Sequence, residues 1–186
     1  TSGRAFCTYS HFFTAQSLQL TMNQTNHYII PSQACIGHVH LKVSDLEQSL
    51  SFYMDLLGFE VTTMYGGQAV FLSAGGYHHH IGLHTWHSHG ADPAPYDRPG
   101  LYHTAILYPT RKDLATIFQR LLTEGYPIRG ASDHGVSEAI YLQDPDENGV
   151  ELYCDRPKEL WEYRLDGSVL MGTRPLDLQQ LLAELE

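Results

Sequence analysis

Twelve histidines in 186 residues are the first chemical signal in this sequence. Three short segments with alternating apolar residues each carry a side chain able to bind a metal ion: His38 in GHVHLKV, His103 in LYHTAILY and Glu151 in GVELY. Because strand side chains alternate between faces, each lies opposite an apolar face. Two imidazoles and one carboxylate are the ligand set of non-haem Fe(II) sites, which keep positions open for guests. We therefore predict one shared metal site.

An internal repeat runs through most of the chain. Residues 36–61 and 101–128 each begin as a short alternating strand and continue as an amphipathic helix. Residues 69–84 and 139–153 then match as further strands, bounded by glycine- or aspartate-rich turns. This predicts two units, each with a strand, a helix and two or three more strands. Units this short are expected to share one sheet system.

The repeat also relates the candidate ligands to one another. Aligning the two units places His38 on His103, whereas Glu151 falls on Gly82. His40 shares the face of His38, but one strand usually supplies one ligand, so we expect His40 to line a pocket.

Local signals mark the ends of the two helices. Ser44 with Glu47 forms a capping-box pattern, and Thr110 with Asp113 forms its weaker variant. A glycine suited to the left-handed position follows each helix: Gly58 and Gly125. Residues 144–149, DPDENG, predict a turn with solvated acids.

Composition divides the chain into five parts. We expect an N-terminal arm (1–35), a first unit (36–87), a proline-containing linker (88–100), a second unit (101–158) and a tail (159–186) with a short helix at 176–182, a lid or interface element. Met22 is a candidate natural start, which would make residues 1–21 foreign or upstream sequence. The alternative is a genuine, loosely ordered arm.

Charge and cysteine content exclude several classes of protein. A formal charge of −10 disfavours nucleic acid or an anionic membrane as a partner. No run reaches the ~18 apolar residues of a membrane span. Three scattered cysteines do not make a disulfide scaffold, so we expect a reducing, cytoplasmic setting.

The sequence resembles the vicinal oxygen chelate superfamily of paired βαβββ modules. The matching strings are GHVHLKVSDLEQSLSFYMDLLGF, LYHTAI and YLQDPDENGVELY, within residues 36–158. The superfamily includes glyoxalase I, the bleomycin- and fosfomycin-resistance proteins and the extradiol catechol dioxygenases. The resemblance implies an α+β fold of two tandem βαβββ modules, forming a cupped mixed sheet around a metal. It also implies a homodimer.

Within the superfamily, the match is better to the extradiol dioxygenases. A glyoxalase would bring a fourth protein ligand where this chain has Gly82. Tyr141 matches the tyrosine that contacts the bound catecholate, and His134 resembles that family's histidine beside the site. His79 falls near its acid–base histidine. A one-residue slip would substitute a neighbour, His78 or His80.

Other interpretations of these residues remain open. Tyr141 aligns with Phe71 and can be an aromatic core position instead. We expect the substrate pocket to include His40, Phe71 and His80. The histidines at 84, 87 and 89 are expected at the mouth or on the surface.

The resemblance therefore implies ring opening of a small aromatic catechol with O2 at Fe(II), with Mn, Zn or Ni as alternative metals. Dioxygenases of this type often contain four modules, and this chain contains two. The alternatives are another metalloenzyme of the superfamily, such as a glyoxalase-like lyase, an isomerase or a thiol transferase, and a non-catalytic binder of small molecules.

Overall fold

The computed structural model describes residues 27–186. The prediction about Met22 and residues 1–21 lies outside that range. The chain divides into two compact units, Thr1–Cys35 and Ile36–Glu186. All helices and strands among the described residues belong to the second unit, so the fold below is that of residues 36–186.

The first module, residues 36–87, has a strand, a helix and three more strands. Its elements are β1 (Val39–Lys42), α1 (Leu46–Leu50), its π-helical continuation η1 (Ser51–Leu56), β2 (Glu60–Tyr65), β3 (Ala69–Ser73) and β4 (Ile81–His84). The strands form the first sheet, in the order β1-β4-β3-β2. β1 runs parallel to β4, and the other neighbours are antiparallel.

The second module, residues 101–158, repeats this order. Its elements are β5 (Thr104–Leu107), α2 (Arg111–Thr123), β6 (Gly130–Asp133), β7 (Ser137–Gln143) and β8 (Gly149–Asp155). The second sheet has the order β5-β8-β7-β6-β9, where β9 (Arg174–Pro175) comes from the tail. The α+β class with two tandem βαβββ modules is confirmed. The expected single sheet system is not formed, because the strands of each module pair among themselves in two separate open mixed sheets.

The two sheets have the same register. The cross-strand rows are His40–Gly82–Phe71 in the first sheet and Ala105–Glu151–Tyr141 in the second. The predicted alignment is therefore confirmed, because His38 and His103 precede their rows by the same number of residues.

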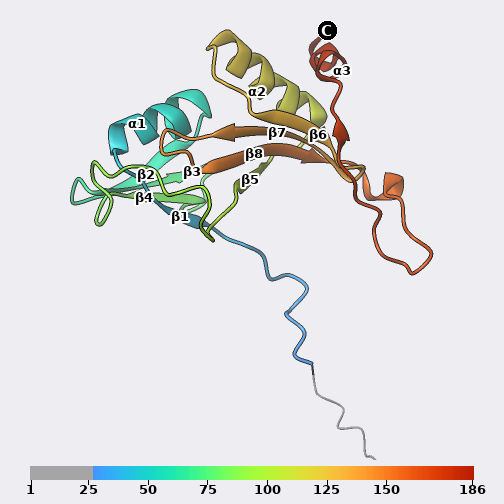
Figure 1. The fold of residues 1–186 in the computed structure, drawn as a ribbon, viewed down its shortest axis with the longest axis horizontal. Coiled ribbons are helices and arrows are strands. Elements are labelled where there is room, and N and C mark those ends of the chain that lie inside the picture. Colours follow the sequence, from blue (N-terminus) through green and yellow to red (C-terminus); the bar gives the residue numbers. More distant parts are fainter. Residues whose placement is uncertain (1–26) are drawn as a thin grey trace, which may run out of the picture. The chain divides into compact units, whose positions relative to one another are not determined.

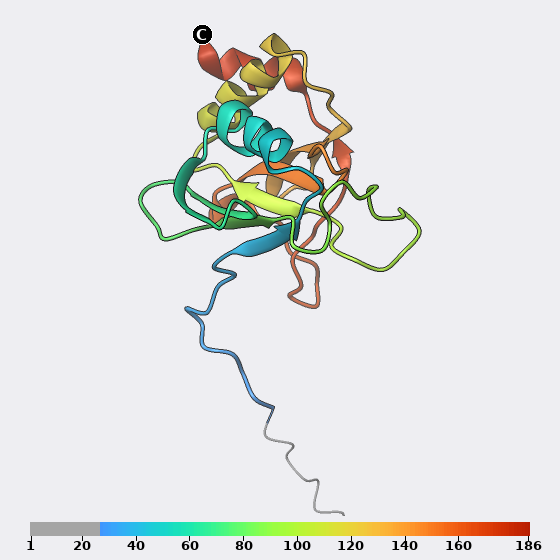
Figure 2. The same cartoon turned by 90° about the vertical axis from the view of Figure 1, so that its left-hand side faces the viewer.

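Helices cover one side of both sheets. In Figures 1 and 2, α1 and α2 lie on the same side of the strands. Leu41 and Val43 point to this covered side and are buried, whereas His38 and His40 are exposed on the other side. We call this second side the open face of each sheet.

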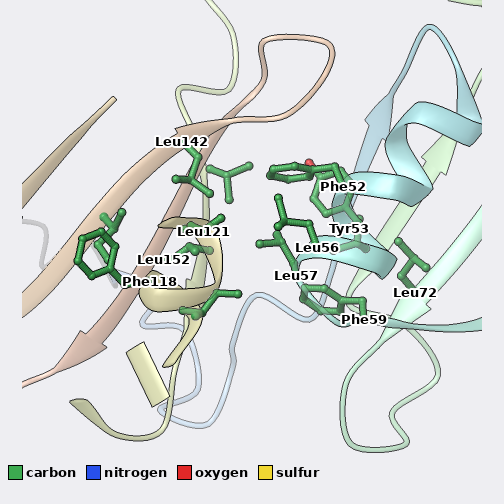
Figure 3. Packing of buried hydrophobic residues seen from close by; sticks show 14 of the residues in the cluster. Phe52, Tyr53, Leu56, Leu57, Phe59, Leu72, Phe118, Leu121, Leu142 and Leu152 are labelled. Atoms are coloured by element: carbon green, nitrogen blue, oxygen red, sulfur yellow. The ribbon is translucent and has the colours of Figure 1, made fainter. Parts of the chain in front are cut away.

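One hydrophobic core joins the two modules. Phe52 and Leu57 from the first helical segment belong to the same buried cluster as Leu121 from α2 and Leu152 from β8. Figure 3 shows these side chains between the helices and strands of both modules. The modules are therefore packed together through their covered sides.

The turn between β7 and β8 clamps the first module. The hydroxyl of Tyr53 donates to Oδ2 of Asp144 at 3.0 Å, and the backbone N–H of Ser44 donates to the Asp146 carboxylate at 3.0 Å. Burial raises the pKa of Asp144, which is only 4% exposed. The prediction that the acids of this turn are solvated is wrong for Asp144, because its carboxylate also accepts backbone N–H groups from its own turn, including that of Asn148.

The helix ends follow local rules, with one correction. The N-cap of α1 is Asp45, whose side chain accepts from the N–H of Gln48, so the Ser44–Glu47 box was wrong by one residue. Thr110 caps α2 as predicted, accepting from the N–H of Asp113. Gly58 and Gly125 follow the helices with φ of 86° and 66°, the left-handed conformation that glycine adopts without strain.

The tail returns to the second module. After η2 (Lys158–Leu160) and β9 it forms α3 (Leu178–Leu182) and η3 (Ala183–Leu185), close to the predicted 176–182 helix. Leu181 is fully buried in the core, and α3 packs on α2, away from the open face. Among residues 27–186, no helix combines the length and the apolar character that crossing a bilayer requires.

Candidate metal and substrate site

His103 and Glu151 meet on the open face of the second sheet. His103 immediately precedes β5, and Glu151 lies in the parallel neighbour β8. Nε2 of His103 is 2.9 Å from Oε2 of Glu151, and both side chains are at least half-buried. Nδ1 of His103 is buried and has no hydrogen-bond partner among the described residues. The small side chain of Ala105, paired with Glu151, leaves room for this contact.

Tyr141 and His134 extend this contact into a chain of hydrogen bonds. The Tyr141 hydroxyl lies 3.0 Å from Oε1 of Glu151 and 2.6 Å from Nε2 of His134. Nδ1 of His134 in turn lies 2.7 Å from the carbonyl oxygen of Gly172. Burial, reinforced by the charge of Glu151, raises the pKa of Tyr141 to about 12. Tyr141 is therefore a neutral donor near pH 7.

A second group of rings lies on the open face of the first sheet. The ring centroids of His38 and His79 are 4.5 Å apart. Phe71 lies 5.0 Å from His79 and 5.6 Å from His40. Desolvation, followed by neighbouring imidazoles, lowers the pKa of His40 and of His79. Neutral imidazoles at these positions can bind a metal or accept a proton.

The three consecutive histidines do not lie within a strand as predicted. β4 begins only at Ile81, so all three belong to the loop that precedes it. Of the three, the structure brings His79 against His38, whereas Nδ1 of His80 faces the hydroxyl of Ser73 at 3.2 Å. Nδ1 of His78 lies 2.7 Å from Nδ1 of His79. The loop, rather than strand alternation, decides which ring faces the site.

Gly82 is required by the ring beside it. A Cβ atom at this position would lie 2.7 Å from Cδ2 of His40, closer than real Cβ contacts allow. His40 thus covers the place that Glu151 occupies in the second module. In the first module an acidic side chain at this position would have to displace the ring of His40.

The predicted ligand set is only partly assembled within one chain. His103 and Glu151 are in contact, but His38 lies on the other sheet, beside His79. Among residues 27–186, no three histidine, cysteine, aspartate or glutamate side chains lie close enough to share an ion. The donor types and the unpartnered nitrogen of His103 fit a divalent metal, so the second sheet presents half of a site.

The sequence predicts His84 at the mouth or on the surface, but it does not predict two contacts of this region. His84 stacks on Trp86, with ring centroids 4.4 Å apart, and lies 4.6 Å from His40. Strand alternation from His40 through its parallel neighbour would have placed His84 on this face. The contact from Gly172 to His134 has no sequence signal, since it uses a backbone carbonyl.

The fold and these contacts define a class of protein. The chain belongs to the Glyoxalase/Bleomycin resistance protein/Dioxygenase superfamily, whose family model matches residues 35–152. The vicinal oxygen chelate resemblance is thereby confirmed. Among relatives, a catechol-2,3-dioxygenase of Bacillus subtilis is 42% identical over 151 residues, covering 80% of this chain and 51% of the relative. The chain thus spans about half the length of that protein.

Further comparisons agree on the family and the fold. A biphenyl-2,3-diol 1,2-dioxygenase of Rhodococcus globerulus is 33% identical over 132 residues, covering 69% of this chain and 68% of the relative. The structure of a glyoxalase/dioxygenase from Nostoc punctiforme superposes with a TM-score of 0.55 at 18% sequence identity. The match covers 71% of this chain and 99% of the Nostoc chain. A lactoylglutathione lyase from Agrobacterium tumefaciens has a TM-score of 0.52 at 22% identity, covering 68% and 96%. The last two similarities concern the fold alone.

Proposed function

We propose that this chain is an extradiol-type dioxygenase that opens a catechol-like ring with O2 at Fe(II). The observation that carries the proposal is the position of Glu151, whose two oxygens contact His103 and Tyr141. One oxygen faces an imidazole that would hold a metal together with Glu151, and the other faces a phenol suited to contact a diol. The names of the Bacillus and Rhodococcus relatives support this substrate class.

In this proposal His103, Glu151 and His38 hold the ion. Ferrous iron, when bound, supplies the positive charge that favours a deprotonated diol and the electrons exchanged with O2. The reducing compartment predicted from the cysteines suits that oxidation state. Mn, Zn and Ni are the alternative metals for the same donor set.

Tyr141 and His134 would move the first proton. The Tyr141 hydroxyl donates to Oε1 of Glu151 at 3.0 Å, and rotation of this O–H would turn its single proton toward Nε2 of His134, 2.6 Å away, as the Tyr141 oxygen takes a proton from the diol. This leaves a catecholate and an imidazolium. His79, beside His38, would act as the general acid–base group on the opposite side of the ring. His134 and His79 thus divide the proton transfers between the two sheets.

A second copy of the chain would complete the site. The histidines of the first sheet and the His103–Glu151 pair of the second sheet lie on open faces. We propose a homodimer in which these faces meet, bringing the three ligands to one ion. His40, Phe71 and His80 would then line the substrate pocket. Gly82 leaves no fourth protein ligand, which favours a dioxygenase over a glyoxalase.

The test uses protein purified without oxygen. We expect iron in the protein, consumption of one O2 per ring opened, and a yellow product from catechol or 2,3-dihydroxybiphenyl. Glu151→Gln should lose both the iron and the activity. The control variant is His89→Ala, which changes a histidine outside these contacts and should keep both.

Other outcomes would replace this proposal. Ni or Zn in the protein, with no O2 uptake, would indicate a lyase, isomerase or transferase of the same superfamily. Saturable binding of a planar ligand by metal-free protein would indicate a binding protein. Sedimentation of the protein as a monomer, with full activity, would contradict the homodimer.

A further inference from the structure

The tail forms a defined arm beside the second sheet. The arm comprises residues 161–175 and runs out and back after η2 (orange to red in Figure 1). Tyr163 and Val169 form an isolated antiparallel bridge between its outgoing and returning segments, and the N–H of Leu170 donates to the carbonyl of Glu162 at 2.8 Å. The arm is therefore an ordered hairpin, although its tip at Leu165 is fully exposed.

Both ends of the arm are fixed to the module. At its start, Nε1 of Trp161 donates to the carbonyl of Arg156 at 2.9 Å. At its end, β9 pairs with β6, with Arg174 opposite Asp133. The guanidinium of Arg156 also bonds the carboxylate of Asp133 at 3.0 Å, which ties the two ends to one another.

His134 and Gly172 bond each other twice. The N–H of Gly172 donates to the carbonyl of His134 at 3.2 Å, and Nδ1 of His134 lies 2.7 Å from the carbonyl of Gly172. The second contact fixes a proton, because a carbonyl oxygen can only accept. Nδ1 must carry hydrogen, and in the neutral ring Nε2, which faces the Tyr141 oxygen, is an acceptor that competes with Oε1 of Glu151 for the single Tyr141 proton.

Hydrogen bonds, rather than close packing, hold this contact. A cavity of about 160 Å³ lies between the arm and β6, lined on one side by His134 and Arg156 and on the other by Leu170 and Gly172. A ring beside such a space could rotate if its Nδ1 had no acceptor. The hydrogen bond from Nδ1 to the Gly172 carbonyl removes that freedom, and the backbone hydrogen bond between the same two residues holds that carbonyl in place.

We propose that the arm is a positioning element for His134, with the Gly172 backbone fixing the tautomer and the direction of the imidazole that faces Tyr141. This inference rests on the proposed function for its catalytic consequence. The fixed tautomer itself is a property of the metal-free protein and is measured without any reaction.

The experiment combines nitrogen NMR with turnover. Two-bond proton–nitrogen correlations of 15N-histidine-labelled protein should show Nδ1 of His134 protonated, with assignment from the missing signal of His134→Asn. Gly172→Pro removes the donor and forces a ring against the His134 carbonyl, so the Nδ1–H form should give way to a mixture of tautomers. Ring opening should fall about 10–100-fold, as when an outer partner of a site is lost, while the iron content stays constant.

Gly172→Ala is the matched control, because an added Cβ meets nothing within 4 Å and both backbone groups remain. It should keep the Nδ1–H signal.

If Gly172→Pro does not fold, Trp161→Phe loosens the other end of the arm and should also produce the mixture of His134 tautomers. An Nε2–H tautomer in the unmodified protein, an unchanged signal in both arm variants, or a lost signal with unchanged turnover would each overturn the proposal. Absence of turnover in every protein, with the expected NMR result, would count against the proposed function instead.

Discussion

The two modules share one backbone pattern and carry opposite chemistry on it. At matching register positions the first has His40, Gly82 and Phe71, and the second has Ala105, Glu151 and Tyr141. The bulky residue and the small residue have exchanged strands. In the first module the ring of His40 covers Gly82, and in the second Ala105 leaves room for Glu151.

This difference shows how a duplicated fold can divide a site. Backbone register decides where side chains meet, and one exchange of large for small decides which strand supplies the functional group. At these positions the first module has an imidazole and a phenyl ring, and the second has the carboxylate and the phenol. The predictions below test this division, beginning with the largest expected effect.

Removing a ligand from the second module should abolish metal binding. His103→Ala leaves Glu151 without its neighbouring imidazole. We expect iron content near zero and turnover reduced by more than about 100-fold, beyond the usual cost of losing an outer partner. Elemental analysis of anaerobically purified protein measures the iron content. Full iron occupancy in this variant would refute the ligand assignment.

Exchanging Tyr141 and Phe71 between the two cross-strand rows should show that turnover needs a phenol at position 141. Tyr141→Phe removes the hydrogen bonds to Glu151 and His134, and we expect turnover to fall about 10–100-fold with iron retained. Adding Phe71→Tyr should not restore activity, since Phe71 lies beside His40 and His79, and not beside Glu151 and His134. Steady-state rates of the single and double variants provide the comparison, and recovery in the double variant would contradict it.

Gly82→Ala should destabilise the first module through contact with His40. We expect a loss of about 1–3 kcal/mol in the free energy of unfolding, the usual cost of overpacking. Combining it with His40→Ala, which reproduces the small residue found in the second module, should recover most of this loss. Urea denaturation of the single and double variants measures the coupling. Strictly additive effects would show that the two side chains do not compete for space.

The smallest effect concerns alkaline stability. Tyr108 corresponds to the buried Val43 of the first module, and burial raises its pKa to about 12. Below pH 10 the phenol is neutral in both folded and unfolded chains, so its contribution is complete. Between pH 10 and 12 the unfolded chain releases its proton first, and stability falls. Tyr108→Phe should therefore lose less stability than the unmodified protein when urea midpoints at pH 8 and pH 11.5 are compared.

Short-range rules predicted much of the fold. Strand alternation gave the correct faces for Leu41 and Glu151, and Gly125 ended its helix as expected. Errors arose where a distant partner outweighed the local signal. Asp144 looked like a solvated turn acid, but a hydroxyl from the other module covers it. The histidine run looked like part of a strand, but the sheet begins one residue later.

For the candidate site, the sequence contributed the repeat and the residue types, and the family resemblance singled out Tyr141, whereas the strand register places Tyr141 beside Glu151. The sequence did not reveal that His38 lies with His79, or that Gly172 holds His134. Loop geometry fixes the first contact, and a backbone carbonyl makes the second. Neither has a residue pattern that spacing along the chain can display.

Taken alone, the sequence determined the two strand–helix–strand units and which side chains face away from the helices, because alternation and helical period are local properties of the chain. Tertiary structure decided which of those side chains touch. The two modules pack through their covered sides, so the open faces of one chain carry their functional groups as separate halves. That separation depends on contacts between residues about a hundred positions apart, such as Ser44 with Asp146.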